Sequence, residues 1–365
     1  MTSAFKLLAL GVCVPCLALD LTSPSDYQVF QRETRIRGKI TITGSAAICD
    51  SVQVRLSGKR WQSVALSGLG CTFKADIVAA AGGWYKVEVR TLSKGNQNGM
   101  ALVDHVGIGE IFVIAGQSNS TNYGEEKQQT TSGMVSSFNG GTWVLANDPQ
   151  SGVQDSSAGG SFIPSFGDAL YAKIKVPVGV ASVGFGGSSV RQWLPAGDQF
   201  ATPPTTNRFV VPSGNGQWKS DGTLFNGLLV RLRQLGPHGF RALLWHQGES
   251  DTHQDPPFEM PAAEYRILME RVIVQSRLGA GWNFPWFVAQ VSYKSPADLG
   301  SPEIRGAQRS LWKNGLALQG PDSDLLLGEM RQNGGKGIHM SAKGLVAHGR
   351  MWAERVWLYL DKIAN

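Results

Sequence analysis

Four short and nearly unbroken apolar runs constrain the fold of this chain more than any other feature. They occupy residues 110–115, 176–183, 242–245 and 285–291. Such runs are typical of strands that are buried on both faces, as in a parallel sheet. A helical pattern lies between the last two runs at residues 262–278, a second follows at 304–312, and a last one runs from the expected N-cap Ser341 toward Ile363. Strands that alternate with helices predict a three-layer α/β/α domain over residues 107–365.

The first third of the chain has a different pattern. Polar and apolar residues alternate at positions 35–42, 51–56 and 84–89, with Gly- and Ser-rich turns between these stretches. Period-two alternation predicts antiparallel strands with one solvated face. We therefore expect a small, immunoglobulin-like β-sandwich over residues 20–106. The Gly-, Ser- and Thr-rich stretch at residues 123–160 is interpreted as a long surface loop that shapes the site.

The N-terminal segment indicates export. Lys6 precedes an apolar run at residues 7–19, which is shorter than the ~20 residues that span a bilayer. We interpret residues 1–18 as a signal peptide, with a buried first strand as the alternative. The protein is then expected to be secreted, periplasmic or otherwise extracellular, and no later apolar run is long enough to cross a membrane. In an exported chain, Cys49 and Cys71 are predicted to form a disulfide.

Composition and motifs argue against several classes of function. The formal net charge is only +6 and no Lys/Arg-rich run occurs, so a nucleic-acid partner is not expected. No Cys/His cluster has the spacing of a zinc site, so we expect no metal. The partial G-x-G at residues 184–186 has no acidic residue placed to hold a ribose, so no dinucleotide or other cofactor is expected.

Polar, glycine-containing loops follow three of the apolar runs, at residues 116–120, 184–189 and 246–251. Ligands bind at the carboxyl edge of an open parallel sheet, so these loops and His339 are expected to converge there. Ser118 could act as a nucleophile and His339 as its base. The backbone N–H groups of Ser118, Gly186 or Gly187 and the Gln247 amide could hold an oxyanion. Ser118 lacks a G-x-S-x-G elbow, which argues against an ordinary α/β-hydrolase.

The ordered set of these blocks resembles the serine, glycine, asparagine/glutamine and histidine blocks of the SGNH hydrolases. The blocks are 116–119, 186–188, 245–251 and His339, and the resemblance covers roughly residues 106–364. It is closest to the branch of sialate O-acetylesterases and acetylxylan esterases, where glutamine replaces asparagine. The resemblance implies a flavodoxin-like fold preceded by a β-sandwich. It also implies metal-independent removal of acetyl groups from sugars, with an acetylated oligo- or polysaccharide as the substrate.

The third member of the triad is an open question. Many SGNH hydrolases have an aspartate two or three residues before the histidine, but Gly337 and Lys336 occupy these positions. Glu249 is the natural substitute, as the resemblance also suggests, and we expect its carboxylate within ~2.6–3.2 Å of His339. Asp251, Asp324 or a Ser–His dyad are the alternatives.

Candidate substrate-binding residues are Asn119, Trp193 and His246. Trp193 could equally pack in the core, and His246 could hydrogen-bond there. Two other functions stay open: a lipase or thioesterase on the same scaffold, and a carbohydrate-binding protein without catalysis. The sequence leaves the identity of the sugar and the oligomeric state open.

Overall fold

The computed structural model describes residues 19–67 and 70–363, which form two compact units. The first unit includes residues up to Pro24, Thr41–Ile77 and Lys86–Val103, and the second unit includes the remainder. The boundary expected near residue 106 stays a prediction, since the chain passes between the units more than once. The expected signal peptide, residues 1–18, lies outside the described residues. In the part of the chain that is described, no helix is long and apolar enough to cross a membrane.

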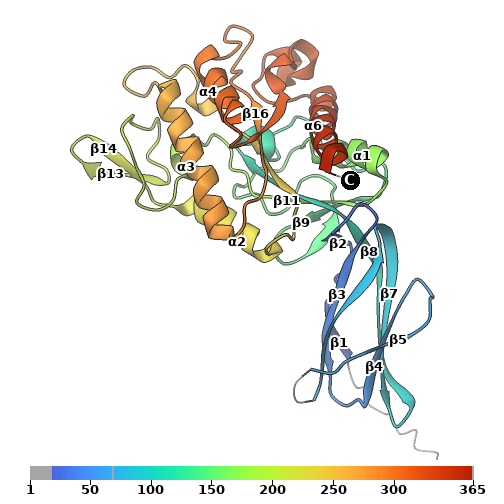
Figure 1. Ribbon diagram of the computed structural model, residues 1–365. Helices are drawn as coiled ribbons and strands as arrows, with labels where there is room; N and C mark the ends of the chain where they lie inside the picture. Colours follow the sequence, from blue (N-terminus) through green and yellow to red (C-terminus); the bar gives the residue numbers. More distant parts are fainter. Residues whose placement is uncertain (1–18, 68–69, 364–365) are drawn as a thin grey trace, which may run out of the picture. The chain divides into compact units, whose positions relative to one another are not determined.

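The second unit contains a largely parallel sheet (Figure 1). Its strands lie in the order β10-β9-β11-β8-β15-β16-β17, and only β10 runs antiparallel to its neighbour. The bounds are β8 (Asn96–Gly116), β9 (Val135–Phe138), β10 (Trp143–Leu145), β11 (Val178–Ser182), β15 (Ala242–His246), β16 (Trp286–Gln290) and β17 (Leu318–Asp322). The four apolar runs are thus β8, β11, β15 and β16. Strands β9 and β10 lie within residues 123–160, where we had expected only a surface loop.

Helices cover both faces of this sheet. On one face lie α1 (Ile163–Ile174) and α6 (Ala342–Ile363). On the other face lie α2 (Thr223–Leu235), α3 (Ala262–Ala280) and α4 (Pro302–Lys313). Successive residues of β8 alternate between the two layers, because side chains along a strand point to opposite faces. Ile111 and Val113 pack with α2–α4, whereas Phe112 and Ile114 pack with α1 and α6. The expected α/β/α architecture is confirmed.

Local signals in the sequence explain where the two C-terminal helices begin. The hydroxyl of Ser301 accepts a hydrogen bond from the Ile304 N–H at 3.1 Å, and Pro302 is the first residue of α4. Before α6, the Ser341 hydroxyl accepts from the Gly344 N–H at 3.2 Å, as expected of an N-cap. This cap ends the loop that carries His339 and connects it to a helix packed on the sheet.

The shorter elements complete the described chain. The strands are β1 (Leu19–Ser23), β2 (Gln28–Gln31), β3 (Arg37–Ala46), β4 (Ser51–Leu56), β5 (Gln62–Val64), β6 (Cys71–Ala80), β7 (Gly82–Ser93), β12 (Gln199–Phe200), β13 (Val210–Gly214) and β14 (Gln217–Ser220). The short helices are η1 (Ser118–Ser120), η2 (Val190–Trp193), η3 (Glu249–Asp251), η4 (Ser323–Leu325), η5 (Gly328–Met330) and α5 (Gln332–Gly335).

The first unit is a small β-sandwich. One of its sheets has the order β1-β3-β6, and the other pairs β4 with β5 and β7, and β7 with β8. The alternating sequence pattern gives each strand one buried face, which includes Ile42 of β3, Val52 and Val54 of β4 and Phe73 of β6. The β-sandwich expected from the sequence is therefore present.

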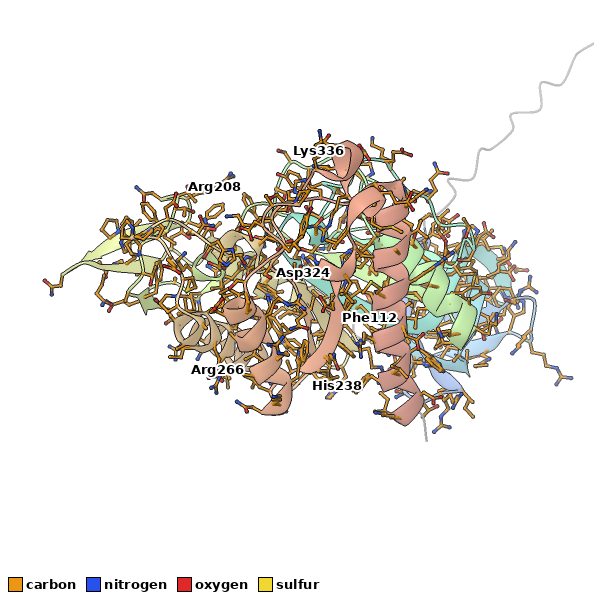
Figure 2. All side chains as sticks on the ribbon, turned by 90° about the horizontal axis from the view of Figure 1, so that it is seen from above. Phe112, Arg208, His238, Arg266, Asp324 and Lys336 are labelled. Carbon is orange, nitrogen blue, oxygen red and sulfur yellow. A yellow bond between two sulfur atoms is a disulfide. The ribbon has the colours of Figure 1, made fainter. Side chains whose placement is uncertain are left out.

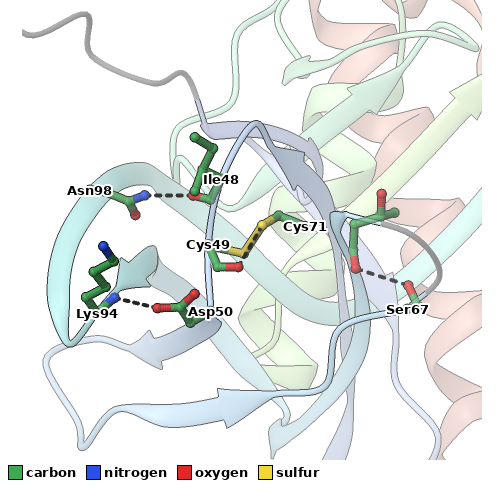
Figure 3. Close-up of a disulfide and its surroundings, with 8 residues drawn as sticks. Ile48, Cys49, Asp50, Ser67, Cys71, Lys94 and Asn98 are labelled. Atoms are coloured by element: carbon green, nitrogen blue, oxygen red, sulfur yellow. Dashed lines mark hydrogen bonds between the residues drawn. A yellow bond between two sulfur atoms is a disulfide. The ribbon is translucent and has the colours of Figure 1, made fainter.

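A disulfide joins Cys49 to Cys71 within this unit, as predicted (Figure 3). The two Cα atoms lie 5.7 Å apart. The flanking loop is also held by hydrogen bonds: the Asn98 amide donates to the carbonyl of Ile48 at 2.7 Å, and the Lys94 N–H donates to the Asp50 carboxylate. The residues on both sides of Cys49 are thus also held by the neighbouring chain.

We expect loss of this disulfide to destabilise the first unit by about 3 kcal/mol. The cysteines are 22 residues apart, and closing a loop of this length removes that much chain entropy from the unfolded state. The measurement is urea unfolding of the oxidised protein beside a Cys49→Ala/Cys71→Ala variant, with the reduced wild type as the control. Equal midpoints for the oxidised protein and the variant would contradict the expectation.

Candidate active site

Three of the polar loops leave the same edge of the sheet. Strand β8 lies between β11 and β15, with Ile114 paired to Ser182 on one side and Gly116 paired to His246 on the other. The loops that follow these strands must therefore start side by side. Gly116 has a φ of +126°, and a side chain there would collide with the backbone of His246. The close approach of the serine and glutamine loops thus requires glycine at this position.

The loop with His339 reaches the same edge through Asn119. The Asn119 amide nitrogen donates to a carboxylate oxygen of Glu249 at 2.9 Å and to the carbonyl of Ile338 at 3.3 Å. One side chain therefore ties together the serine, glutamine and histidine blocks. Both of its N–H groups are used and its exposed fraction is 7%. The amide nitrogen of Asn119 therefore positions the loops, and the expected role of Asn119 in substrate binding stays a prediction.

Ser118 begins the short helix η1 directly after β8. Its carbonyl accepts hydrogen bonds from the N–H and the hydroxyl of Thr121, at 3.0 and 2.9 Å. Its own N–H, at the helix start, has no partner among the described residues. Ser118 thus combines a hydroxyl with an unused backbone donor, which is the combination that an acyl-transfer nucleophile needs.

His339 lies beside the serine loop, in contact with Tyr123. The two ring centroids are 5.0 Å apart, and a side chain at Gly186 would collide with the same tyrosine ring. The histidine and glycine blocks therefore meet around Tyr123. Burial and the nearby charge of Arg331 lower the pKa of His339 to about 4. Its imidazole is neutral near pH 7, as a general base must be.

The glycine turn supplies a backbone donor, but Gly186 and Gly187 differ. The N–H of Gly186 donates to the carboxylate of Asp155 at 2.6 Å. The N–H of Gly187 has no partner within residues 19–67 and 70–363, and the space around its Cα is open. Its φ of +68° favours glycine. Of the two glycines, the structure leaves Gly187 with a donor available for an oxyanion, and Gly186 is corrected to a residue that holds the turn.

Gln247 is buried beneath these loops and its amide is already bonded. Its nitrogen donates to the Asp251 carboxylate at 2.7 Å and to the carbonyl of Ser188 at 3.2 Å. Its exposed fraction is 0%. Because both N–H groups have acceptors, the expectation that Gln247 stabilises an oxyanion is corrected. Gln247 connects the glutamine block to the glycine block.

Glu249 does not hydrogen-bond to His339, contrary to our expectation. One carboxylate oxygen accepts from Asn119 and lies 3.8 Å from Nδ1 of His246, whereas the other has no partner in the described structure. Burial raises the pKa of this carboxyl to about 7. Glu249 thus contacts the serine loop through the Asn119 amide.

The two alternative acids are also engaged elsewhere. Asp251 accepts from the Ser189 hydroxyl at 2.5 Å and from the Val190 N–H at 2.9 Å, and it pairs with the buried Arg191 at 3.4 Å. Asp324 accepts from the N–H groups of Ser292 and Tyr293 and pairs with Arg305 at 2.6 Å. Neither carboxylate bonds the imidazole of His339.

Trp193 and His246 are core residues. Each has an exposed fraction of 0%. The indole of Trp193 packs edge-on against Trp245 at 5.1 Å and donates to the Ser188 hydroxyl, while Nε2 of His246 lies 2.9 Å from the hydroxyl of Ser323. A sugar cannot reach either ring, so the expectation that they bind substrate is corrected in favour of the packing alternative.

The structure adds residues that the sequence analysis did not select. Gln332 lies 3.1 Å from Nδ1 of His339. Tyr123 is 39% exposed beside His339, and Asp155 holds Gly186. The side-chain oxygen of Gln117 accepts from the Ser250 N–H at 3.1 Å. Tyr123 and Asp155 lie within the 123–160 stretch, whose polar composition was the only signal for them.

Figure 2 places this edge of the second unit by its labelled side chains. Lys336, three residues before His339, lies on the same side as Arg208, whereas His238 lies at the opposite end. Arg208 faces the ring of Phe185 at 4.4 Å, next to the glycine turn. Among the residues that the structure describes, no group of three or more His, Cys, Asp or Glu side chains is placed to hold a metal ion.

Comparison with solved structures finds similar folds, of which one has a TM-score above 0.5. A carbohydrate acetylesterase from Xanthomonas citri is similar with a TM-score of 0.56 and 20% identity, over 94% of this chain and 75% of that one. A protein from Arabidopsis thaliana is similar with a TM-score of 0.47 and 17% identity, over 68% of this chain and 98% of that one. No curated protein matches the chain significantly.

The family comparison covers most of the second unit. Residues 108–358 match the family described as "Carbohydrate esterase, sialic acid-specific acetylesterase". These residues include all four blocks that suggested the SGNH resemblance, which is confirmed. The chain therefore belongs to this family of carbohydrate esterases, and it is a carboxylic ester hydrolase.

Proposed function

We propose that the protein removes O-acetyl groups from carbohydrates through an acetyl-enzyme on Ser118, with His339 as the general base. The observation that supports this proposal is the contact between the loops of Ser118 and His339 at one edge of the sheet, where the N–H groups of Ser118 and Gly187 have no partner among the described residues. A nucleophile, a base and oxyanion donors are the parts that acyl transfer needs. The proposal retains the sequence-based roles of Ser118, His339 and Gly187.

In the first half-reaction, the Ser118 hydroxyl attacks the acetyl carbonyl while Nε2 of His339 accepts its proton. The carbonyl oxygen becomes an oxyanion, which the N–H groups of Ser118 and Gly187 stabilise. Collapse of this intermediate breaks the bond between the acetyl carbon and the sugar oxygen, and this oxygen takes the proton from His339 to leave as a hydroxyl. In the second half-reaction, His339 accepts a proton from the water that attacks the acetyl-serine, and the Ser118 oxygen takes this proton back as its bond to the acetyl carbon breaks and acetate leaves.

The substrate that we propose is an acetylated oligo- or polysaccharide. The family description and the name of the Xanthomonas citri protein both refer to carbohydrate esters. Tyr123, which is 39% exposed beside His339, offers a ring on which a sugar face can pack. This ring is a better candidate contact than the buried Trp193.

We also propose that the protein is exported. The Cys49–Cys71 disulfide supports this location, because disulfides persist in oxidising compartments. The basic and apolar pattern of residues 1–18 is the sequence argument for a signal peptide. N-terminal sequencing of protein recovered outside the cytoplasm would test both points, with a mature chain that begins near residue 19 as the expected result.

The test of the proposed activity is acetate release from a panel of acetylated polysaccharides, together with a p-nitrophenyl acetate burst. A burst of p-nitrophenol equal to the enzyme concentration is expected of an acetyl-enzyme mechanism. A carbohydrate-binding protein without catalysis would release neither product. A lipase or thioesterase would prefer p-nitrophenyl octanoate or acyl thioesters over acetyl sugars, and that preference would overturn the proposal.

We expect kcat/KM to stay high in mildly acidic solution and to fall only below about pH 4. The base must be neutral, and the pKa of His339 is lowered to about 4 by burial and by Arg331. Activity is therefore present above this pKa and is lost as the pH falls through it. The measurement is kcat/KM for p-nitrophenyl acetate against pH, with circular dichroism as the control for folding. An acidic limb near the ordinary histidine pKa of about 6.5 would contradict this expectation.

A further inference from the structure

We propose that Gln332 is the positioning residue of the active site, which holds His339 in the tautomer that accepts the serine proton. This inference rests on the proposed function. A catalytic imidazole needs a partner at its far nitrogen, so that the lone pair of the other nitrogen faces the nucleophile. A carboxylate usually fills that place, but Glu249, Asp251 and Asp324 all bond other groups.

Main-chain hydrogen bonds hold Gln332 beside His339. The side-chain nitrogen of Gln332 lies 3.1 Å from Nδ1 of His339, and the backbone N–H of Gln332 donates to the His339 carbonyl at 3.0 Å. The neighbouring residues Arg331 and Met340 form an antiparallel bridge. Main-chain bonds thus hold residues 332 and 339 side by side, so the contact between their side chains does not depend on a mobile loop.

Gly337 leaves the space that the Gln332 side chain occupies. A Cβ atom at residue 337 would collide with Cγ of Gln332 and lie 3.1 Å from both Cδ and Nε2. The Gly337 N–H donates to the Gln332 carbonyl at 3.0 Å, which holds the two residues together. Glycine at 337 is therefore what allows the amide of Gln332 to reach Nδ1.

An amide can perform the positioning role through its oxygen. A half-turn of the terminal amide exchanges its oxygen and nitrogen. No described protein group holds the Gln332 side-chain oxygen, so this half-turn costs no hydrogen bond. With the oxygen toward His339, Nδ1–H donates to it, and the lone pair of Nε2 is free to accept the proton of Ser118.

The other polar groups around His339 do not replace Gln332. Arg331 directly precedes Gln332 and donates to the Ile338 carbonyl at 2.7 Å, and the Tyr123 ring contacts the face of the imidazole with its centroid 5.0 Å away. The Glu249 carboxylate is held by Asn119, and the Glu125 carboxylate accepts from the Asn333 N–H at 3.2 Å. None of them bonds Nδ1. Because the Gln332 amide is neutral, it orients the ring without raising its pKa, in agreement with the low pKa of His339.

The decisive experiment compares Gln332→Met and Gln332→Glu with the wild type and with Gln319→Met. Gln319 is an exposed residue of β17 and is a matched control for the chemical change. We expect Gln332→Met to lower kcat about 100-fold, in the range of general base catalysis, with little change in KM and in melting temperature. The control should retain wild-type kinetics.

Gln332→Glu provides the readout that a purely structural residue would not affect. A carboxylate at Nδ1 can still orient the ring, so we expect kcat to be retained. Its negative charge should raise the pKa of His339, which moves the acidic limb of kcat/KM upward by at least about one pH unit. If the acidic limb of the kcat/KM profile were unchanged in Gln332→Glu, direct contact between residue 332 and Nδ1 of His339 would be refuted.

A second pair of variants tests the role of Gly337. Gly337→Ala should displace the Gln332 side chain and reproduce the kcat loss of Gln332→Met. Gln332→Ala/Gly337→Asp should recover activity relative to Gln332→Ala, because the aspartate can occupy the vacated space.

Full kcat and an unchanged pH profile in Gln332→Met would overturn the inference. The proposed function would survive that result if Ser118→Ala were inactive, and it would fall if the wild type released no acetate.

Discussion

Ser118→Ala is expected to lower kcat/KM for acetyl esters by at least about 1,000-fold while the protein stays folded. The loss follows from removal of the only atom that can form the acetyl-enzyme in the proposed mechanism, and such changes cost several orders of magnitude in rate. The fold is expected to persist because the contacts of Ser118 are made by its backbone. Its carbonyl accepts from Thr121, and alanine keeps that carbonyl. The measurements are the p-nitrophenyl acetate burst, steady-state acetate release and the melting temperature.

Ser120→Ala is the matched control for this experiment. Ser120 belongs to the same short helix, is fully buried, and donates its hydroxyl to the Gln117 carbonyl at 2.6 Å. Its loss should cost about 1 kcal/mol of stability, the net value of one hydrogen bond, and leave the burst intact. Comparable turnover by Ser118→Ala and wild type would show that Ser118 is not the nucleophile. Equal losses in both variants would point to damage of η1 instead.

Asp251→Ala is expected to destabilise the second unit by about 3–5 kcal/mol and to abolish activity with it. Asp251 and Arg191 form an ion pair in which both side chains have an exposed fraction of 0%. Removal of one partner leaves a buried charge uncompensated, which accounts for the expected size of the effect. The same carboxylate holds Gln247, Ser189 and the Val190 N–H, so the glycine turn would keep only the weaker bond from Gln247 to the Ser188 carbonyl as a direct side-chain contact with the glutamine block. The measurement is urea unfolding together with acetate release.

Asp198→Ala separates the effect of burial from the loss of an ion pair. Asp198 pairs with Arg271 at 2.6 Å, but these side chains are 20% and 52% exposed. An exposed pair contributes only about 0–1 kcal/mol, so this variant should unfold close to the wild-type midpoint and retain its activity. Similar destabilisation by the two substitutions would show that the buried network around Asp251 has no special role.

The location of the candidate site could be predicted from the sequence because it depends on short-range patterns. A strand buried on both faces needs a continuous apolar run, and the runs at residues 110–115, 176–183 and 242–245 became β8, β11 and β15. Parallel strands end at a common edge, so the loops that follow them had to be neighbours. The same reasoning indicated Ser118 and His339, whose loops the structure joins through Asn119.

The roles of the side chains at that edge were decided by the tertiary structure. Gln247 and Asn119 have amides that could serve an oxyanion or a sugar, but their N–H groups already have acceptors on other loops. Trp193 could stack on a sugar, but it is enclosed in the core. The residue type determines which hydrogen bonds a side chain can make. Only the folded chain determines which of its donors and acceptors are occupied by other protein groups.

The sequence by itself determined the α/β/α domain, the β-sandwich, the disulfide pair and the four blocks of the family. These features depend on periodicity, on cysteine count and on the order of motifs, all of which can be followed along one chain. The partner of His339 depends on something else. Gln332 reaches Nδ1 because a local bridge aligns residues 331 and 340 and because Gly337 lacks a side chain. Such a contact is set by backbone geometry and by excluded volume, and these arise only when the loop packs in three dimensions.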